Sequence, residues 1–154
     1  YGVEDAAAYL TTRRWSGSAW DTLTQHPEHD ATVENVTSMN FDIVYETHPT
    51  NPGKAWLVWG NGTAVSATQW SGSAWGQASV LAGSDDTSFV ALHVESATGA
   101  LFEAEYQSTA SAPDDINERH ILGGGSSWSS PTSIWPGPTV AEPVMFRVTF
   151  DTER

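Results

Sequence analysis

The sequence predicts an all-β protein, and three observations support this class. Runs rich in Thr, Val, Ser, Trp and Gly, with apolar residues at alternate positions, dominate the chain and are typical of half-buried strands. Helix-forming composition occurs only in the segment DAAAYL near the start, which is too short to form a stable helix alone. Asn-Gly and Thr-Gly dipeptides separate neighbouring runs and indicate β-hairpins.

The predicted strands follow one another along the chain. In FDIVYE, residues 41–46, the side chains of Phe41, Ile43 and Tyr45 share one face. The run SFVALHVE is apolar on both faces, so we expect it in the centre of a sheet. The remaining strands are expected at 54–60, 63–70, 88–95 (the SFVALHVE run), 100–106, within ERHIL, and in the regularly alternating PVMFRVTF. Asn61-Gly62 and Thr98-Gly99 are the expected hairpin turns.

The hexapeptide WSGSAW occurs at 15–20 and again at 70–75, and it marks a longer repeat. A degenerate third copy, GGGSSW, ends at Trp128, so Gly-x-x-Trp recurs at intervals of about 55 and then about 53 residues. Each interval holds about four short strands, which is the size of a propeller blade. The expected units are 1–20 (partial), 21–75, 76–128 and 129–154 (partial).

Each hexapeptide is expected to form a tight hairpin. Gly17 and Gly72 supply the positive φ that such a loop needs, and the flanking tryptophans then face each other across the hairpin. Two roles remain open for these rings, because they either pack between repeat units or stay exposed and stack on sugar rings. The ligand-binding candidates are Trp15, Trp20, Trp70, Trp75 and Trp128.

The repeat resembles that of the sialidase-like bacterial propeller proteins. The matching segments are VSATQWSGSAWGQASVL and FVALHVESATGALFEAEY, and the resemblance extends over most of the chain from Leu10 onward. It implies propeller-type blades. The Asp-box of true sialidases has an Asp two residues before the Gly of Gly-x-x-Trp. This chain has Trp15, Trp70 and Gly123 there, so the box is absent.

The resemblance does not extend to a catalytic set. A sialidase-type active site needs three convergent arginines, a Tyr–Glu pair and an acidic Asp. The adjacent pairs Tyr45-Glu46 and Glu105-Tyr106 point to opposite faces of a strand. None of the arginines occupies an equivalent place in successive repeats: Arg13, Arg14, Arg119, Arg147 and Arg154. We therefore expect no enzymatic activity, with a fragment of a glycoside hydrolase as the weakest alternative.

Metal ligands are grouped most densely in QHPEHD. Imidazole and carboxylate groups suit zinc, although a solvated loop explains the same residues. The weak candidates are His26, Glu28, His29 and Asp30. Calcium ligands are a further candidate role for Gly83-Ser84-Asp85-Asp86 and Asp114-Asp115. These residues lack a complete ligand pattern, and turns explain them equally well. We expect no cofactor, with calcium and zinc left open.

Composition excludes several classes of partner. The chain has 19 acidic and 6 basic residues, a net charge of −13, which argues against nucleic acid and anionic membrane surfaces. No apolar run approaches the roughly 18 residues of a membrane span. There is no cysteine, so disulfides and thiolate metal sites are absent. Asn35 and Asn61 lie in glycosylation sequons, which fits an extracellular or cell-surface protein.

The expected ring is incomplete. At about 54 residues per unit the chain holds about 2.9 units, whereas a closed propeller needs at least four. The chain is therefore expected to be part of a longer propeller, to oligomerise, or to form an open sheet or sandwich. Unpaired edge strands invite pairing with another copy, into a ring or a filament. The leading expected function is glycan binding or adhesion, and the alternative is a structural subunit assembled through edge strands.

Overall fold

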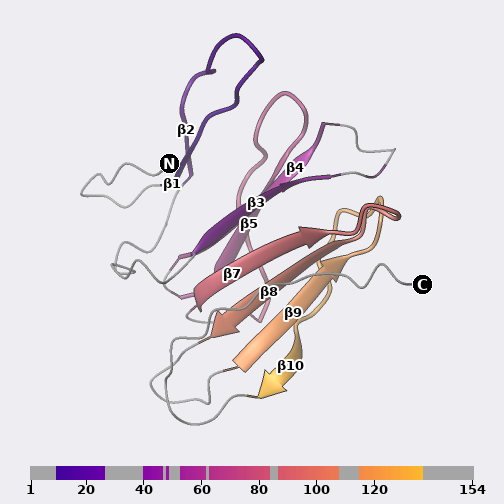
Figure 1. Cartoon of the computed structure of the whole chain (residues 1–154). Helices are drawn as coiled ribbons and strands as arrows, with labels where there is room; N and C mark the ends of the chain where they lie inside the picture. The colour runs from indigo at the N-terminus through magenta and orange to yellow at the C-terminus, as the bar shows by residue number, and fades with distance from the viewer. Residues whose placement is uncertain are drawn as a thin grey trace.

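The fold consists of antiparallel sheets (Figure 1). The computed structural model describes residues 10–26, 40–46, 48, 53–61, 63–83, 87–107 and 115–136. Within these ranges there is no helix and no closed barrel, so the all-β prediction is confirmed. The segment DAAAY and the strand PVMFRVTF lie outside the described residues.

A hairpin and two four-stranded sheets follow one another along the chain. The hairpin pairs β1 (Leu10–Thr12) with β2 (Thr24–His26). The first sheet has the order β3 (Phe41–Tyr45), β4 (Ala55–Gly60), β5 (Val65–Trp70), β6 (Ser79–Val80). The second has the order β10 (Thr132–Pro136), β9 (Asp115–Ile121), β8 (Leu101–Gln107), β7 (Thr87–Val94). Both sheets are therefore meanders in which each strand pairs with the next one along the chain.

Both predicted hairpin turns are present. The Asn61 amide donates to the Ala64 carbonyl at 2.9 Å, and the Asn61 side-chain oxygen accepts from the Ala64 amide at 2.8 Å. At the second turn the Gly99 amide donates to the Glu95 carbonyl at 2.7 Å, with Gly99 at a φ of +68°. Glycine reaches this region without steric cost, which is why the Thr-Gly signal at residues 98–99 succeeded.

The prediction that 88–95 is a central strand is wrong, because β7 is the edge strand of the second sheet. Its apolar character has another cause. Val90 and Leu92 pack against the first sheet, while Phe89 on the opposite face is also buried. The Leu92 amide donates to an Asp42 carboxylate oxygen at 2.8 Å, so a β3 side chain covers part of the β7 edge.

The hairpin and the two sheets form three layers, and two apolar clusters hold these layers together. The larger one lies between the two sheets and contains Trp56, Val58, Val65, Ala67, Leu81, Val90, Leu92, Leu101 and Ile121. The smaller one joins Leu10 of β1 to Leu57 and Trp59 of β4. Side chains on successive positions of β4 thus point alternately toward the second sheet and toward the hairpin, as strand geometry requires. The first sheet is the middle layer, buried on both faces along β4.

Gly72 provides a test of the hairpin geometry. Its φ is +100°, a conformation that L side chains rarely adopt, so we expect Gly72→Ala to lower the free energy of unfolding by about 1–2 kcal/mol. The measurement is urea denaturation followed by circular dichroism. Gly76→Ala is the matched control, because Gly76 does not have a positive φ and an added Cβ meets nothing closer than 3.4 Å. Equal stability of the two variants would contradict the assignment.

Candidate binding site

The two complete hexapeptides have the same local structure. Trp15 and Trp20 form an antiparallel bridge, as do Trp70 and Trp75. Gly17 and Gly72 have φ values of +99° and +100°, so the predicted positive φ is confirmed at both. In each loop the amide of the first serine (Ser16 or Ser71) donates to the carbonyl of the alanine (Ala19 or Ala74) at 2.9 Å. The hydroxyl of the same serine donates to this carbonyl at 3.0 Å. The ring centroids of the two pairs lie 5.4 and 5.6 Å apart.

The surroundings of these tryptophans differ from copy to copy. The side chains of Trp70, Trp75 and Trp128 are half-buried, whereas Trp15 is 51% exposed and Trp20 is 62% exposed. Trp75 packs on the Leu10–Leu57–Trp59 cluster, and Trp128 meets Trp56 edge-on at 5.4 Å. Trp70 also contacts Arg14 of the hairpin, so three of the five predicted ligand-binding tryptophans serve contacts between layers.

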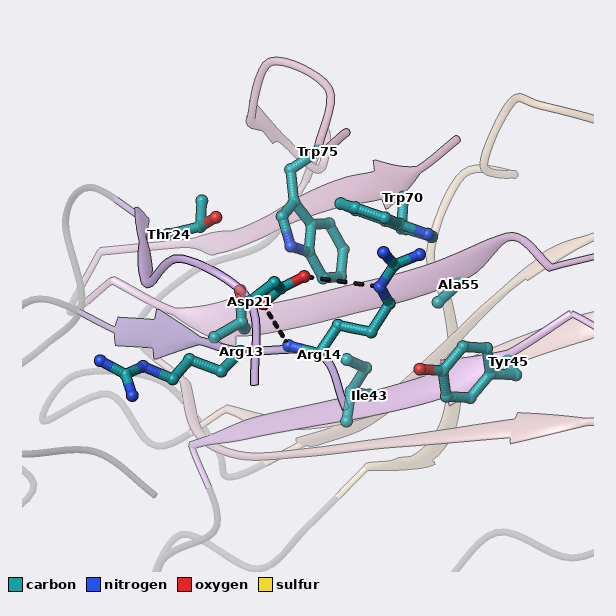
Figure 2. Close-up of a pocket in the computed structure, with 10 residues that line it drawn as sticks. Arg13, Arg14, Asp21, Thr24, Ile43, Tyr45, Ala55, Trp70 and Trp75 are labelled. Carbon is teal, nitrogen blue, oxygen red and sulfur yellow. Dashed lines mark hydrogen bonds and ion pairs between the residues drawn. The ribbon is translucent and has the colours of Figure 1, made fainter. Parts of the chain in front are cut away.

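A groove lies between the β1–β2 hairpin and the first sheet (Figure 2). Residues that are distant in the sequence line it: Thr12, Arg13, Arg14, Asp21, Thr24, Ile43, Tyr45, Ala55, Trp70 and Trp75. Its cavity volume is about 50 Å³, which suits a hydroxyl-sized group or a few waters rather than a whole ligand. A ligand at this place would lie across the mouth of the groove.

Arg14 is held in the groove by three contacts. Its backbone amide donates to an Asp21 carboxylate oxygen at 2.7 Å, and its Nε lies 3.4 Å from the other oxygen. The guanidinium sits 5.2 Å from the centre of the Trp70 ring, a cation–π geometry that Figure 2 shows. Within the described part of the chain its two terminal nitrogens have no hydrogen-bond partner, so their N–H groups are available to a ligand.

Tyr45 forms the opposite wall of the groove. It is 60% exposed, and with Ile43 it projects from β3 below Arg14 in Figure 2. The alternation of FDIVYE predicted that these side chains share a face, but not that this face borders a groove. That outcome depends on where the hairpin packs, so a strand pattern alone cannot identify Tyr45 as a site residue.

A second depression of about 320 Å³ lies beside the second hexapeptide. Trp75 lines both hollows. The other residues that line the depression are uncharged: Trp56, Ala67, Thr68, Gln69, Ser71, Ala74, Gly76, Gln77 and Ser79. Trp56 is almost fully buried there, so the depression presents less aromatic surface than the groove with Tyr45.

His26 is the one residue of the predicted metal group that the structure describes, and it is buried at the hairpin contact. Its Nε2 lies 2.9 Å from the Thr12 hydroxyl, and its ring meets Trp75 edge-on at 5.2 Å. Burial lowers the pKa of His26, which favours the neutral ring in the folded state. Among the described residues no group of three or more His, Cys, Asp or Glu side chains is placed to hold a metal ion.

A buried charge cluster lies between the two sheets, and sequence reasoning missed it as a unit. A terminal nitrogen of Arg119 lies 3.1 Å from a Glu103 oxygen and 2.9 Å from a Glu105 oxygen, and none of the three side chains is exposed. Burial, reinforced by the charge of Glu105 and opposed by Arg119, raises the pKa of Glu103 to about 8. Without solvent access this cluster has no path for a substrate.

The other predicted site residues are not brought together in the described structure. Arg119 is buried between the sheets, whereas Arg13 and Arg14 line the groove beside the hairpin. Asn61 occupies its turn. The following candidates lie outside the described residues: Glu28, His29, Asp30, Asn35, Ser84, Asp85, Asp86, Asp114, Arg147 and Arg154.

Comparison with known proteins yields no match to any family model, curated protein or solved structure. The resemblance to sialidase-like propeller repeats therefore rests on sequence motifs. The described residues contain no helix with the length and apolarity needed to cross a bilayer.

Proposed function

We propose that the chain is an extracellular, non-catalytic glycan-binding module built from propeller-type repeat units. The proposed binding site is the groove between the β1–β2 hairpin and the first sheet. The observation that carries the proposal is the combination of the exposed Tyr45 ring with the fixed Arg14 guanidinium. Sugars are recognised by such pairs, because an aromatic face covers C–H groups while planar N–H donors bind hydroxyl oxygens.

The propeller-type part of the proposal is supported by the layered arrangement of the chain. Two consecutive four-stranded meanders pack face to face, and the hairpin packs on the free face of the first. In the first sheet the second hexapeptide, residues 70–75, begins at the end of the third strand, β5. In the second sheet the degenerate copy that ends at Trp128 follows the third strand, β9. Repeated meanders of this length stack as blades in propeller proteins.

Pre-organisation supports the choice of Arg14. The ion pair with Asp21 and the contact with Trp70 restrict a side chain that otherwise loses considerable entropy on binding. Arg14→Lys retains the positive charge but removes the planar donors. We expect Arg14→Lys and Tyr45→Ala each to weaken glycan binding about tenfold or more.

The test is a glycan array followed by titration calorimetry of the glycans that bind. Ile134→Ala is the control, since Ile134 is exposed on β10 and does not line the groove. Binding that survives Tyr45→Ala and Arg14→Lys unchanged would exclude this groove. A chain that binds no glycan on the array would refute the proposed function.

A further inference from the structure

The second and third copies of the tryptophan motif follow one packing rule. Trp70 is covered by Arg14, and Trp75 by His26, both from the preceding hairpin. Trp128 is covered by Trp56, which belongs to the preceding sheet. In the second and third copies the motif thus packs on the unit that precedes it in the chain.

The first copy has the same local structure, but among the described residues nothing covers its tryptophans in this way. Trp15 and Trp20 are exposed and do not line the groove, which lies on the side of the hairpin that faces the first sheet. On β1 and β2 the cross-strand pair Thr11 and Gln25 points away from the first sheet, because its neighbours Leu10 and His26 are buried against that sheet. We call the set Trp15, Trp20, Thr11 and Gln25 the outer hairpin face.

We propose that the outer hairpin face is a docking surface for a second copy of this chain. In this complex a repeat unit of the second copy covers Trp15 and Trp20, in the same way as the hairpin covers Trp70 and Trp75. The internal contacts show that this chain makes surfaces that cover such a tryptophan pair with a guanidinium, an imidazole and apolar side chains. The rings of Trp15 and Trp20 are the kind of large, fixed side chains that dominate protein interfaces.

This face is a better docking surface than the described sheet edges. The edge strand β6 has only two residues, and β10 carries a bulge between Ser133 and Trp135. The other two edge strands, β3 and β7, lie against each other and are joined by the hydrogen bond from the Leu92 amide to Asp42. Short, bulged or covered edges oppose strand pairing between copies. The docking proposal involves neither Tyr45 nor the terminal nitrogens of Arg14, so it does not depend on the glycan groove.

The test is sedimentation velocity of the full chain over a wide range of concentration. We expect reversible self-association, and we expect Trp15→Ala/Trp20→Ala to weaken it about tenfold or more. Leu122→Ala/Ile134→Ala is the matched control, since it removes two exposed apolar side chains elsewhere. Association should also shift the tryptophan emission to the blue in the wild-type chain.

A second variant protects the test against a folding defect. Gln25→Arg leaves both tryptophans in place and adds a bulky charge to the outer hairpin face, so we expect it to weaken association while circular dichroism stays unchanged. A chain that remains monomeric at all concentrations would overturn the proposal. So would an oligomer that neither set of substitutions in this face affects.

Discussion

Replacing Arg119 with methionine is expected to lower the free energy of unfolding by about 3–5 kcal/mol. The guanidinium is the cation that lies between two fully buried carboxyl groups, Glu103 and Glu105. Removing it leaves the charge of Glu105 between the sheets without its counter-charge, whereas Glu103, with its raised pKa, is mostly protonated at neutral pH. The cost of burying an uncompensated charge exceeds the apolar contact that methionine retains.

Urea denaturation at neutral pH measures this effect. Arg13→Met is the matched control, because Arg13 is exposed and is expected to change stability by less than about 0.5 kcal/mol. Replacing all three members, with Arg119→Met, Glu103→Leu and Glu105→Met, should recover most of the loss, since an apolar cluster needs no compensation. A loss below about 1 kcal/mol in Arg119→Met would contradict the buried geometry.

The second large effect is a pH dependence that Glu103→Gln removes. The pKa of Glu103 rises from 4.5 in the unfolded chain to about 8 in the folded chain, so the folded state binds the proton more tightly. The stabilisation is complete below about pH 4.5 and is lost as the pH rises toward 8. A change of this size corresponds to an effect on the order of 5 kcal/mol.

Glutamine resembles the protonated acid, so Glu103→Gln is expected to be more stable than the wild type at pH 8 and to differ little from it at pH 4. The measurement is the difference in unfolding free energy between the two chains across this range. His26 acts in the opposite direction, because its lowered pKa makes stability fall as the pH drops below 6.5. That contribution is common to both chains and cancels in the difference. A difference that is constant with pH would refute the assignment to Glu103.

The local features of this fold were predictable because they depend on a few neighbouring residues. Gly17 and Gly72 adopt positive φ, and the turns at Asn61 and Gly99 form where the dipeptides indicated. Most predicted strand positions agree with the structure to within a few residues, and β9 begins earlier than ERHIL suggested. Each of these signals acts over a few residues, so no long-range contact is needed to express it.

The sequence pattern misplaced features that depend on which layer covers a strand. Alternation along β8 separates Phe102 and Tyr106 from Glu103 and Glu105, and a carboxylate face ordinarily points to water. Here the glutamates face the first sheet, and their burial is compensated by Arg119, which lies opposite Glu103 in the β8–β9 register. Similarly, β7 is apolar on both faces and yet is an edge strand.

The sequence by itself determined the all-β class, the turns and the identical geometry of the two WSGSAW hairpins. Only the tertiary structure decided that Trp70, Trp75 and Trp128 are packed while Trp15 and Trp20 remain exposed. The physical reason is that a hexapeptide specifies its own backbone and the contact between its two rings. Burial of those rings depends on the neighbouring layer, and within the described structure the first copy has none on its outer side.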